Sequence, residues 1–489
     1  MSVARQAAHG VAWNMLFGVG SRVLQLVGVL VLTHWIAPEK YGPVIAASIL
    51  VTTASMLTSF AFGQYLIAKR APPEVAFQAL IVHVGLGVAA MAVVYVLRHP
   101  LGEFFGTPET YQYVLGFTVA VMLDRSRYIP ERLLLRALRF RAVAAINATG
   151  ELAYITTALA AAKLLGPNAI VLGWLVRSSL TCALYFRTAP RAEWAAPARL
   201  RGADVGNLFG YGLPIMIGSI SDHLATRFDN LIMSKLFNAA VMARYNLSYS
   251  LAEMPVNAIA VQIGDVLMPA FSKMEDEQRR SAVVRAASLM SLIVSPLGVG
   301  LAAVSATLVA AFFDQKWGPE MAPMLGILAT TGVVRPMTWS AVAYLQSVQK
   351  TRLIMYSSFF RAIVVLSLVG VCGYLGGENW ACIGAAVGFA LHSLLTIIGA
   401  GRIAGFSAGA YLLGVGRPLL PCVPMYLAVV GAQGAMAELG VPLLVSLVGQ
   451  VVVGAVVYVG SALVLLRSSV QEFVRLGRDA LRKRRGKAD

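Results

Sequence analysis

The stretch VPLLVSLVGQVVVGAVVYVGSALVLL, residues 441–466, decides the class of this protein because it contains no charged side chain. A helix of roughly 20 apolar residues, at about 1.5 Å per residue, crosses the hydrocarbon core of a bilayer. Stretches of this kind recur about fourteen times along the chain. Of the 489 residues, 58% are apolar and 13% are charged, against about 25% charged residues in a soluble protein. The sequence therefore predicts an all-α integral membrane protein.

The fourteen apolar stretches predict two related bundles of six transmembrane helices, followed by two further helices. The stretches lie at 11–34, 43–67, 78–97, 111–135, 143–165, 169–186, 208–236, 242–268, 284–313, 322–347, 354–375, 380–401, 411–432 and 441–466. Residues 1–187 form the predicted N-terminal bundle, 188–206 a proline-containing cytoplasmic linker and 207–401 the C-terminal bundle. Residues 402–466 hold the two additional helices, and 467–489 form a basic cytoplasmic tail. The first stretch is longer than the apolar region of a signal peptide, so we expect it to remain as a transmembrane helix.

The distribution of Lys and Arg predicts the orientation. The whole chain contains 40 Lys and Arg residues and 23 Asp and Glu residues. In the loops and at the ends of the predicted spans, 25 of the 40 fall on one side of the membrane and 5 on the other. Cytoplasmic loops carry the excess, so both termini are predicted to be cytoplasmic. The arginine-rich tail is typical of an interfacial helix on anionic lipids, and nucleic-acid binding is disfavoured.

Several classes of function are disfavoured by what the sequence lacks. The four cysteines lie singly within apolar runs and the histidines are scattered, without the spacing of metal ligands,. No GxxxxGK[ST] phosphate-binding loop occurs, and no long external loop or group of catalytic carboxylates is present,. We therefore expect a transporter and not an enzyme, with no metal and no cofactor.

Ionisable residues at membrane depth are the most informative feature, because each costs about 3 kcal/mol at the centre of a bilayer. Apart from the residues counted for the orientation, the predicted spans contain ten cations and seven acids. All ten cations are arginine, whose forked guanidinium suits phosphate oxygens. This excess predicts a polar cavity that favours an anion. The residues are Arg22, Arg125, Arg127, Arg132, Arg177, Arg227, Arg244, Arg335, Arg361 and Arg417, and Asp124, Glu131, Glu151, Asp222, Asp229, Glu253 and Asp265.

The fourth predicted span contains the first candidate site. Asp124, Arg125 and Arg127 lie about halfway between its ends, and Pro130 follows. We interpret the two arginines as binding an anionic headgroup and Asp124 as a candidate for ion coupling. In the alternative interpretation, the helix ends near Leu123 and leaves both arginines in a cytoplasmic loop.

Further candidates lie in four other spans. In the seventh span, Arg227 is a candidate for anion binding and Asp222 for ion coupling, and the alternative is a purely structural ion pair. Arg22 and Arg335 lie near mid-depth with no acid three or four residues away, so both are candidates for anion binding. Glu253 in the eighth span suits coupling to a proton or sodium ion, and a structural hydrogen bond is its alternative.

Three loop motifs resemble those of Wzx-type polysaccharide flippases. They are IAPEKYG at 36–42, LRALRFR at 135–141 and VLMPAFS at 266–272. The resemblance covers the whole chain and implies the fold of the multidrug/oligosaccharidyl-lipid/polysaccharide (MOP) exporter superfamily. It also implies a bacterial inner-membrane location and an undecaprenyl-pyrophosphate-linked oligosaccharide as cargo. Polysaccharide polymerase and export machinery are the implied partners.

Two functional hypotheses follow. The first is a flippase that moves a lipid-linked oligosaccharide by alternating access through a cationic cavity, for cell-surface polysaccharide biosynthesis. It would be coupled to a proton or sodium gradient or to consumption of the lipid outside. The alternative is a drug or cation antiporter of the MATE type, which would favour an acidic excess in the cavity.

Overall fold

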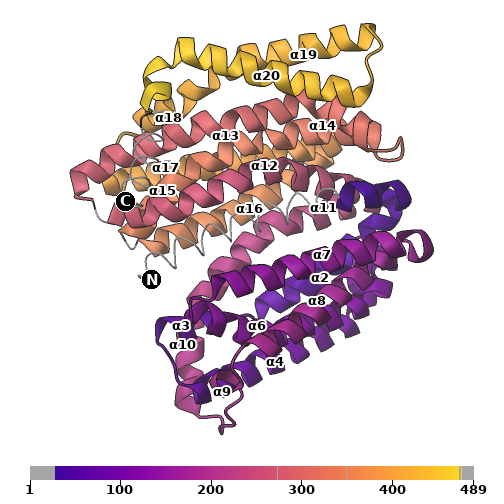
Figure 1. Ribbon diagram of the computed structural model, residues 1–489, viewed down its shortest axis with the longest axis vertical. Helices are drawn as coiled ribbons and strands as arrows, with labels where there is room; N and C mark the ends of the chain where they lie inside the picture. The colour runs from indigo at the N-terminus through magenta and orange to yellow at the C-terminus, as the bar shows by residue number, and fades with distance from the viewer. Residues whose placement is uncertain (1–27, 273, 349, 473–474, 476–489) are drawn as a thin grey trace, which may run out of the picture. The chain divides into compact units, whose positions relative to one another are not determined.

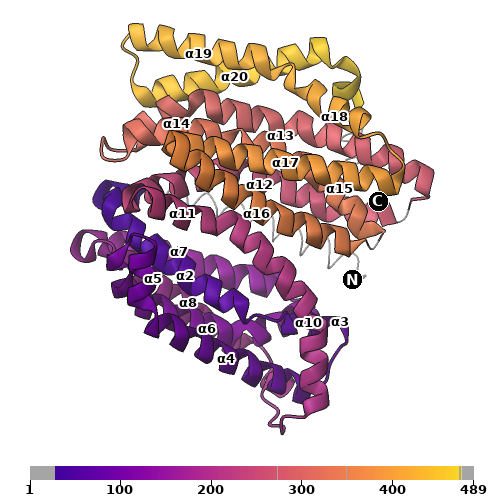
Figure 2. The ribbon, with the colours of Figure 1, turned by 180° about the vertical axis from the view of Figure 1, so that it is seen from behind.

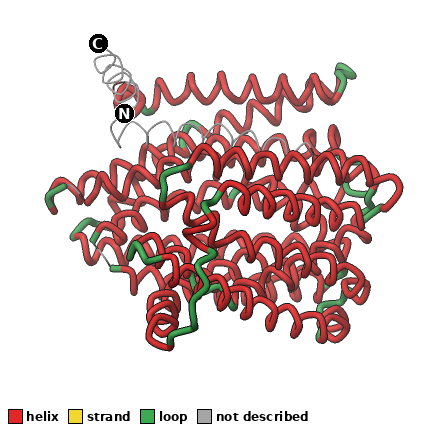
Figure 3. Tube along the Cα trace, turned by 60° about the horizontal axis from the view of Figure 1, so that its bottom comes forward, coloured by secondary structure: helices red, strands yellow, loops and turns green. Residues whose placement is uncertain are grey.

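The computed structural model describes residues 28–272, 274–348, 350–472 and 475, and every regular element among them is helical (Figure 3). Eight helices within this part of the chain are long and apolar enough to cross a membrane. They confirm a multi-pass, all-α membrane protein, whereas the count of fourteen spans stays a prediction. Most of the first predicted span, with Arg22, falls outside the described residues.

By packing, the chain divides into two compact units, Met1–Arg244 and Tyr245–Asp489. The division lies beyond the linker predicted at 188–206, and the predicted domain boundaries stay predictions. The long helix α12, Ala239–Ser272, begins in the first unit and ends in the second.

In the first unit, α6, α7 and α8 pack side by side (Figures 1 and 2). The helix α10 packs against α2, α3 and α4 of the same unit, and Leu208 joins a core with Phe62, Leu66 and Ile129. The elements are α2 (Pro38–Leu57), α3 (Phe62–Ala68), α4 (Pro73–Val96), α5 (Arg98–Phe104), η1 (Pro108–Thr110), α6 (Tyr111–Arg136), α7 (Phe140–Leu165), α8 (Asn168–Thr188), α9 (Arg191–Trp194), α10 (Gly202–His223), η2 (Leu224–Phe228) and α11 (Asp229–Leu236).

In the second unit, α13 is the central element, and α14, α15, α18, α19 and α20 all contact it. One core cluster joins α13 to α15, α17 and α18 through Val283, Tyr344, Ile397 and Tyr411. The elements after α12 are α13 (Asp276–Phe312), α14 (Gly318–Ala329), α15 (Thr331–Ser347), α16 (Thr351–Gly376), α17 (Glu378–Ala404), α18 (Ala408–Gly416), η3 (Arg417–Leu419), α19 (Cys422–Glu438) and α20 (Leu443–Leu465).

Four of the predicted spans are interrupted, and in the thirteenth η3 and a turn at residues 417–421 separate α18 from α19. The second is split into α2 and α3 by non-helical residues 58–61, and the tenth changes from α14 to α15 at Thr330. In the seventh, residues Leu224–Phe228 form one turn of π-helix between α10 and α11. Broken and π-bulged helices at membrane depth mark functional regions in many membrane proteins, so the polar residues around these interruptions are candidates for the site.

The fourth span, in contrast, is continuous. Helix α6 runs from Tyr111 to Arg136 and passes through Asp124 and Pro130 without a break. The alternative in which the helix ends near Leu123 is therefore wrong, and both arginines of this span lie within the helix.

Candidate functional site

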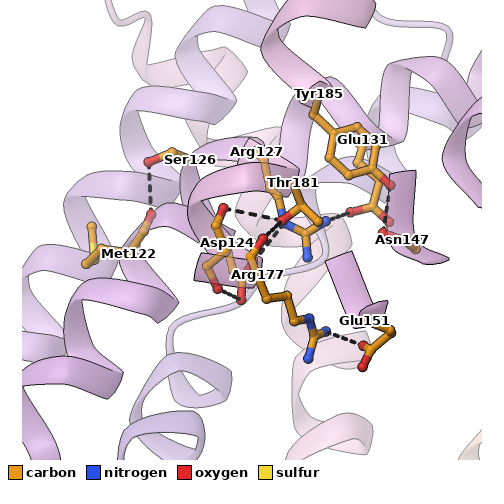
Figure 4. Close-up of polar contacts among 11 residues, drawn as sticks. Met122, Asp124, Ser126, Arg127, Glu131, Asn147, Glu151, Arg177, Thr181 and Tyr185 are labelled. Atoms are coloured by element: carbon orange, nitrogen blue, oxygen red, sulfur yellow. Dashed lines mark hydrogen bonds and ion pairs between the residues drawn. The ribbon is translucent and has the colours of Figure 1, made fainter. Parts of the chain in front are cut away.

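Arg127 is neutralised by two carboxylates of its own helix. Its Nε donates to Oδ1 of Asp124 at 2.7 Å, and its NH1 donates to Oε2 of Glu131 at 3.0 Å (Figure 4). The spacings of three and four residues place all three side chains on one face of α6. The side chain of Arg127 is 11% exposed and lies over the ring of Tyr185, 5.2 Å from its centroid. Its guanidinium meets an anionic substrate only if these ion pairs open.

Helices α7 and α8 extend this polar region. Arg177 of α8 pairs with Glu151 of α7 at 3.2 Å, and Ser178 donates to Asp124 at 3.1 Å. The hydroxyl of Tyr185 donates to Asn147 at 3.0 Å (Figure 4). We call this group the α6–α8 cluster and define it as Asp124, Arg127, Glu131, Asn147, Glu151, Arg177, Ser178 and Tyr185.

The α6–α8 cluster holds three carboxylates and two guanidinium groups, so its formal charge is negative when all are ionised. In addition, Oε2 of Glu151 is buried and accepts no hydrogen bond from a described residue. Sequence reasoning counted Glu151 among the acids at membrane depth and did not select it for ion coupling. Glu151 joins the acids of α6 through packing of α7 against α8, and this contact cannot be predicted from spacing along one helix.

Arg125 lies on the opposite side of α6, because two residues along an α-helix turn the side chain by about 200°. It is 3% exposed and donates to backbone carbonyls of Ser55, Thr58 and His83 and to the Ser55 hydroxyl. None of the described carboxylates forms an ion pair with it. The structure therefore places Arg125 in a buried backbone contact, away from Arg127.

The π-helical turn of the seventh span carries Arg227. This arginine is exposed, and it makes no ion pair or hydrogen bond with another residue that the structure describes. One turn earlier, Nε2 of His223 lies 2.9 Å from the hydroxyl of Thr53 and ties α10 to α2. Asp222 is exposed beside it. Arg227 is thus the described candidate whose guanidinium is open to a ligand.

In the second unit, two residues that the sequence proposed for different roles, Arg335 and Glu253, form an ion pair with each other. Arg335 of α15 forms a close ion pair with Glu253 of α12. Its guanidinium lies 4.9 Å from the centroid of the Phe389 ring, and its NH1 donates to the hydroxyl of Tyr249 at 3.4 Å. An anion that binds Arg335 has to compete with Glu253, so the two predicted roles are linked at this place.

A surface cavity of about 480 Å³ lies at the end of α8. Arg187 and Arg191, both exposed, are among its lining residues. The guanidinium of neither arginine makes an ion pair or hydrogen bond with another described residue. The sequence placed both on the predicted cytoplasmic side and did not select them as site residues.

No group of three or more His, Cys, Asp or Glu that could hold a metal ion occurs in the part of the chain that the structure describes.

Comparisons with known proteins agree with the loop motifs. Residues 31–323 match the family model described as polysaccharide biosynthesis protein. The lipopolysaccharide biosynthesis protein WzxC of Escherichia coli (strain K12) is 24% identical over 403 residues, which cover 81% of this chain and 80% of WzxC. The succinoglycan biosynthesis transport protein ExoT of Rhizobium meliloti (strain 1021) is 23% identical over 496 residues, covering 97% of this chain and 96% of ExoT.

The fold is similar to that of the lipid II flippase MurJ in an inward closed conformation. The TM-score is 0.76 at 12% identity, over 95% of this chain and 99% of the MurJ chain. The resemblance to Wzx-type proteins, predicted from three loop motifs, is confirmed. Because the family model matches more than half of its length, the chain belongs to the polysaccharide biosynthesis protein family.

Proposed function

We propose that this protein is a flippase that moves an undecaprenyl-pyrophosphate-linked oligosaccharide across the bacterial inner membrane by alternating access. The protein is a membrane transporter and not an enzyme, as its relatives are named for transport and polysaccharide biosynthesis. Both termini are proposed to be cytoplasmic. Polysaccharide polymerase, export machinery and anionic membrane lipids are the proposed partners.

The observation that carries the choice of substrate is the exposed guanidinium of Arg227 on a π-helical turn, within the seventh span predicted from the sequence. An unpaired arginine in a membrane-spanning helix needs a polar partner. A pyrophosphate supplies several oxygen atoms to a guanidinium fork, and such bonds are stronger than neutral hydrogen bonds. The sugars would follow the pyrophosphate through the protein while the lipid tail stays in the bilayer.

Coupling is proposed at the ion pair of Glu253 and Arg335. A proton or sodium ion that binds Glu253 would release Arg335 for the anion, and a bound anion would release Glu253 for the cation. Reciprocity of this kind is required of any two coupled binding sites. Ion binding at Asp124 and Asp222 is a proposal of the same kind, and no cofactor is required.

The α6–α8 cluster favours a second candidate function. Its three carboxylates outnumber its two guanidinium groups, as a cavity for cations would require. The alternative is therefore an ion-coupled antiporter of drugs or other organic cations with the MATE fold.

Purified protein in proteoliposomes separates the two functions. One assay follows movement of a fluorescent lipid-pyrophosphate oligosaccharide, and the other follows efflux of a cationic dye from the same vesicles. Lipid movement without dye efflux supports the flippase, and dye efflux alone supports the antiporter. Arg227→Ala is expected to lower lipid movement about tenfold, the effect of about 1.4 kcal/mol, without lowering the unfolding temperature. Arg199→Ala, an exposed arginine of the predicted linker, is the matched control.

A further inference from the structure

The interruption between α2 and α3 exposes backbone groups within a predicted transmembrane span. Helix α2 ends at Leu57 and α3 begins at Phe62. Between them Ala61 has φ of 51°, a left-handed conformation that costs a non-glycine residue about 1 kcal/mol,. The last carbonyls of a helix lack partners within it, and lipid offers none. Something in the protein has to satisfy them.

The guanidinium of Arg125 supplies donors to two of them, the carbonyls of Ser55 and Thr58, and the Ser55 carbonyl also accepts from the backbone N–H and the hydroxyl of Thr58. NH1 of Arg125 donates to the carbonyl of Ser55 at 2.8 Å and to the hydroxyl of Ser55 at 3.0 Å. Its NH2 donates to the carbonyl of Thr58 at 3.1 Å and to the carbonyl of His83 at 2.7 Å, and its Nε donates to His83 at 3.2 Å. We call these four acceptors, O and Oγ of Ser55, O of Thr58 and O of His83, the carbonyl cradle.

The carbonyl cradle has the chemistry of a monovalent cation site. Its acceptors are uncharged oxygens that converge on one buried group, and two of them belong to the C-terminal end of α2, where the helix dipole is negative. Ends of broken helices and unwound carbonyls bind cations in membrane transporters. Here the cation is the guanidinium of Arg125, which belongs to α6.

Position 87 confirms that the space is built for this group. Gly87 of α4 lies against Arg125, and a Cβ atom at this position would overlap with Nε of Arg125. The glycine therefore leaves room for the guanidinium where α4, α6 and the α2–α3 break meet.

We propose that the carbonyl cradle is a binding site for a monovalent cation of the guanidinium class, which Arg125 fills permanently. The break in the second span is thus held by a tethered cation, and a dissolved ion is not needed there. This inference goes beyond the proposed function, since it depends on no substrate. It assigns Arg125 to the architecture of the membrane domain and not to recognition of cargo.

The test is chemical rescue of Arg125→Ala. The full-length variant is purified in detergent and its thermal unfolding is followed with increasing guanidinium chloride, below denaturing concentrations, and with sodium chloride at equal ionic strength. We expect the variant to unfold at a lower temperature than the wild type and to regain at least half of that loss with guanidinium, in a saturable manner. The wild type, whose cradle is filled, should gain nothing.

The matched control is the double variant Gly87→Ala/Arg125→Ala. Its added Cβ occupies part of the space that the guanidinium needs, so rescue should be lost. Equal rescue in the single and double variants, or none in the single variant, would overturn the proposal.

A second comparison holds even if Arg125→Ala does not fold. Arg125→Lys keeps the positive charge, whereas Arg125→Gln keeps a donor without the charge. A tethered cation predicts that the lysine variant unfolds at the higher temperature. A glutamine variant that is equally stable or more stable would show that only hydrogen bonds matter and would refute a cation site.

Discussion

Arg125 and Arg127 stand two residues apart on α6, and their surroundings differ in kind. Arg125 is enclosed by backbone carbonyls, and Arg127 by the carboxylates of Asp124 and Glu131. The residue type is the same for both, and both lie within one continuous helix. The role of an intramembrane arginine is therefore set by what surrounds its guanidinium, which depends on the helices that pack against each face of α6.

The two surroundings differ in how they respond to mutation. Carboxylates can be neutralised by protonation or by substitution with amides, so an ion pair can be removed as a whole. Backbone carbonyls cannot be neutralised or deleted, so loss of their donor leaves them unsatisfied. The comparison predicts a clear order of effects.

The largest effect is expected for Arg125→Leu. The carbonyl of Thr58 would lose its donor, and four further hydrogen bonds to Ser55 and His83 would be lost. We expect a loss of about 3 kcal/mol or more, since an unsatisfied buried acceptor costs about 1 to 3 kcal/mol and each hydrogen bond contributes about 1 kcal/mol. Denaturation of the purified variant in detergent measures this loss. A smaller loss than that of Arg127→Gln would contradict the comparison.

Arg127→Gln is expected to have an intermediate effect of about 2 kcal/mol, because Asp124 and Glu131 lose their partner but keep some contact with water. The triple variant Asp124→Asn/Arg127→Gln/Glu131→Gln removes the whole ion network and should recover most of this stability. If the triple variant is less stable than Arg127→Gln, the carboxylates have a structural role beyond the ion pairs.

The sequence predicted the all-helical class and the resemblance to Wzx-type proteins. It did not predict the break at residues 58–61, because Thr58, Ser59, Phe60 and Ala61 include no proline or glycine. At the break, a guanidinium from α6 contacts the carbonyl of Ser55 and lies in the space left by Gly87 of α4, and both positions are distant in sequence.

The pairing of Arg335 with Glu253 shows the same limit. The sequence showed no acid within three or four residues of Arg335, which suggested that its charge was open to a ligand. The partner comes from another helix, 82 residues earlier in the chain. Spacing along one helix identifies local pairs such as Asp124 with Arg127, and it carries no information on contacts between helices.

Glu253→Gln extends the comparison to the second unit. The substitution removes the negative charge that competes for Arg335, so we expect the half-saturating concentration of lipid-linked substrate to fall by up to about tenfold, as for one charge-assisted hydrogen bond. Concentration-dependent lipid movement in proteoliposomes measures it, with Glu438→Gln of α19 as a control acid. A rise in the half-saturating concentration would show that Glu253 holds Arg335 in its binding position.

The smallest effect on stability is expected at the cavity beside α8, where Arg187 and Arg191 have neither carbonyl nor carboxylate partners. The double variant Arg187→Ala/Arg191→Ala should unfold within about 0.5 kcal/mol of the wild type, as exposed substitutions do. It should instead retain less anionic phospholipid after purification, because near a membrane surface each arginine contributes about 1 kcal/mol to binding of anionic lipid. Quantifying co-purified lipid by mass spectrometry tests this expectation, with Arg199→Ala as the control. Unchanged lipid retention would mean that these arginines orient the chain in the membrane without holding a lipid. A large loss of stability would place them with Arg125 among the residues on which the fold depends.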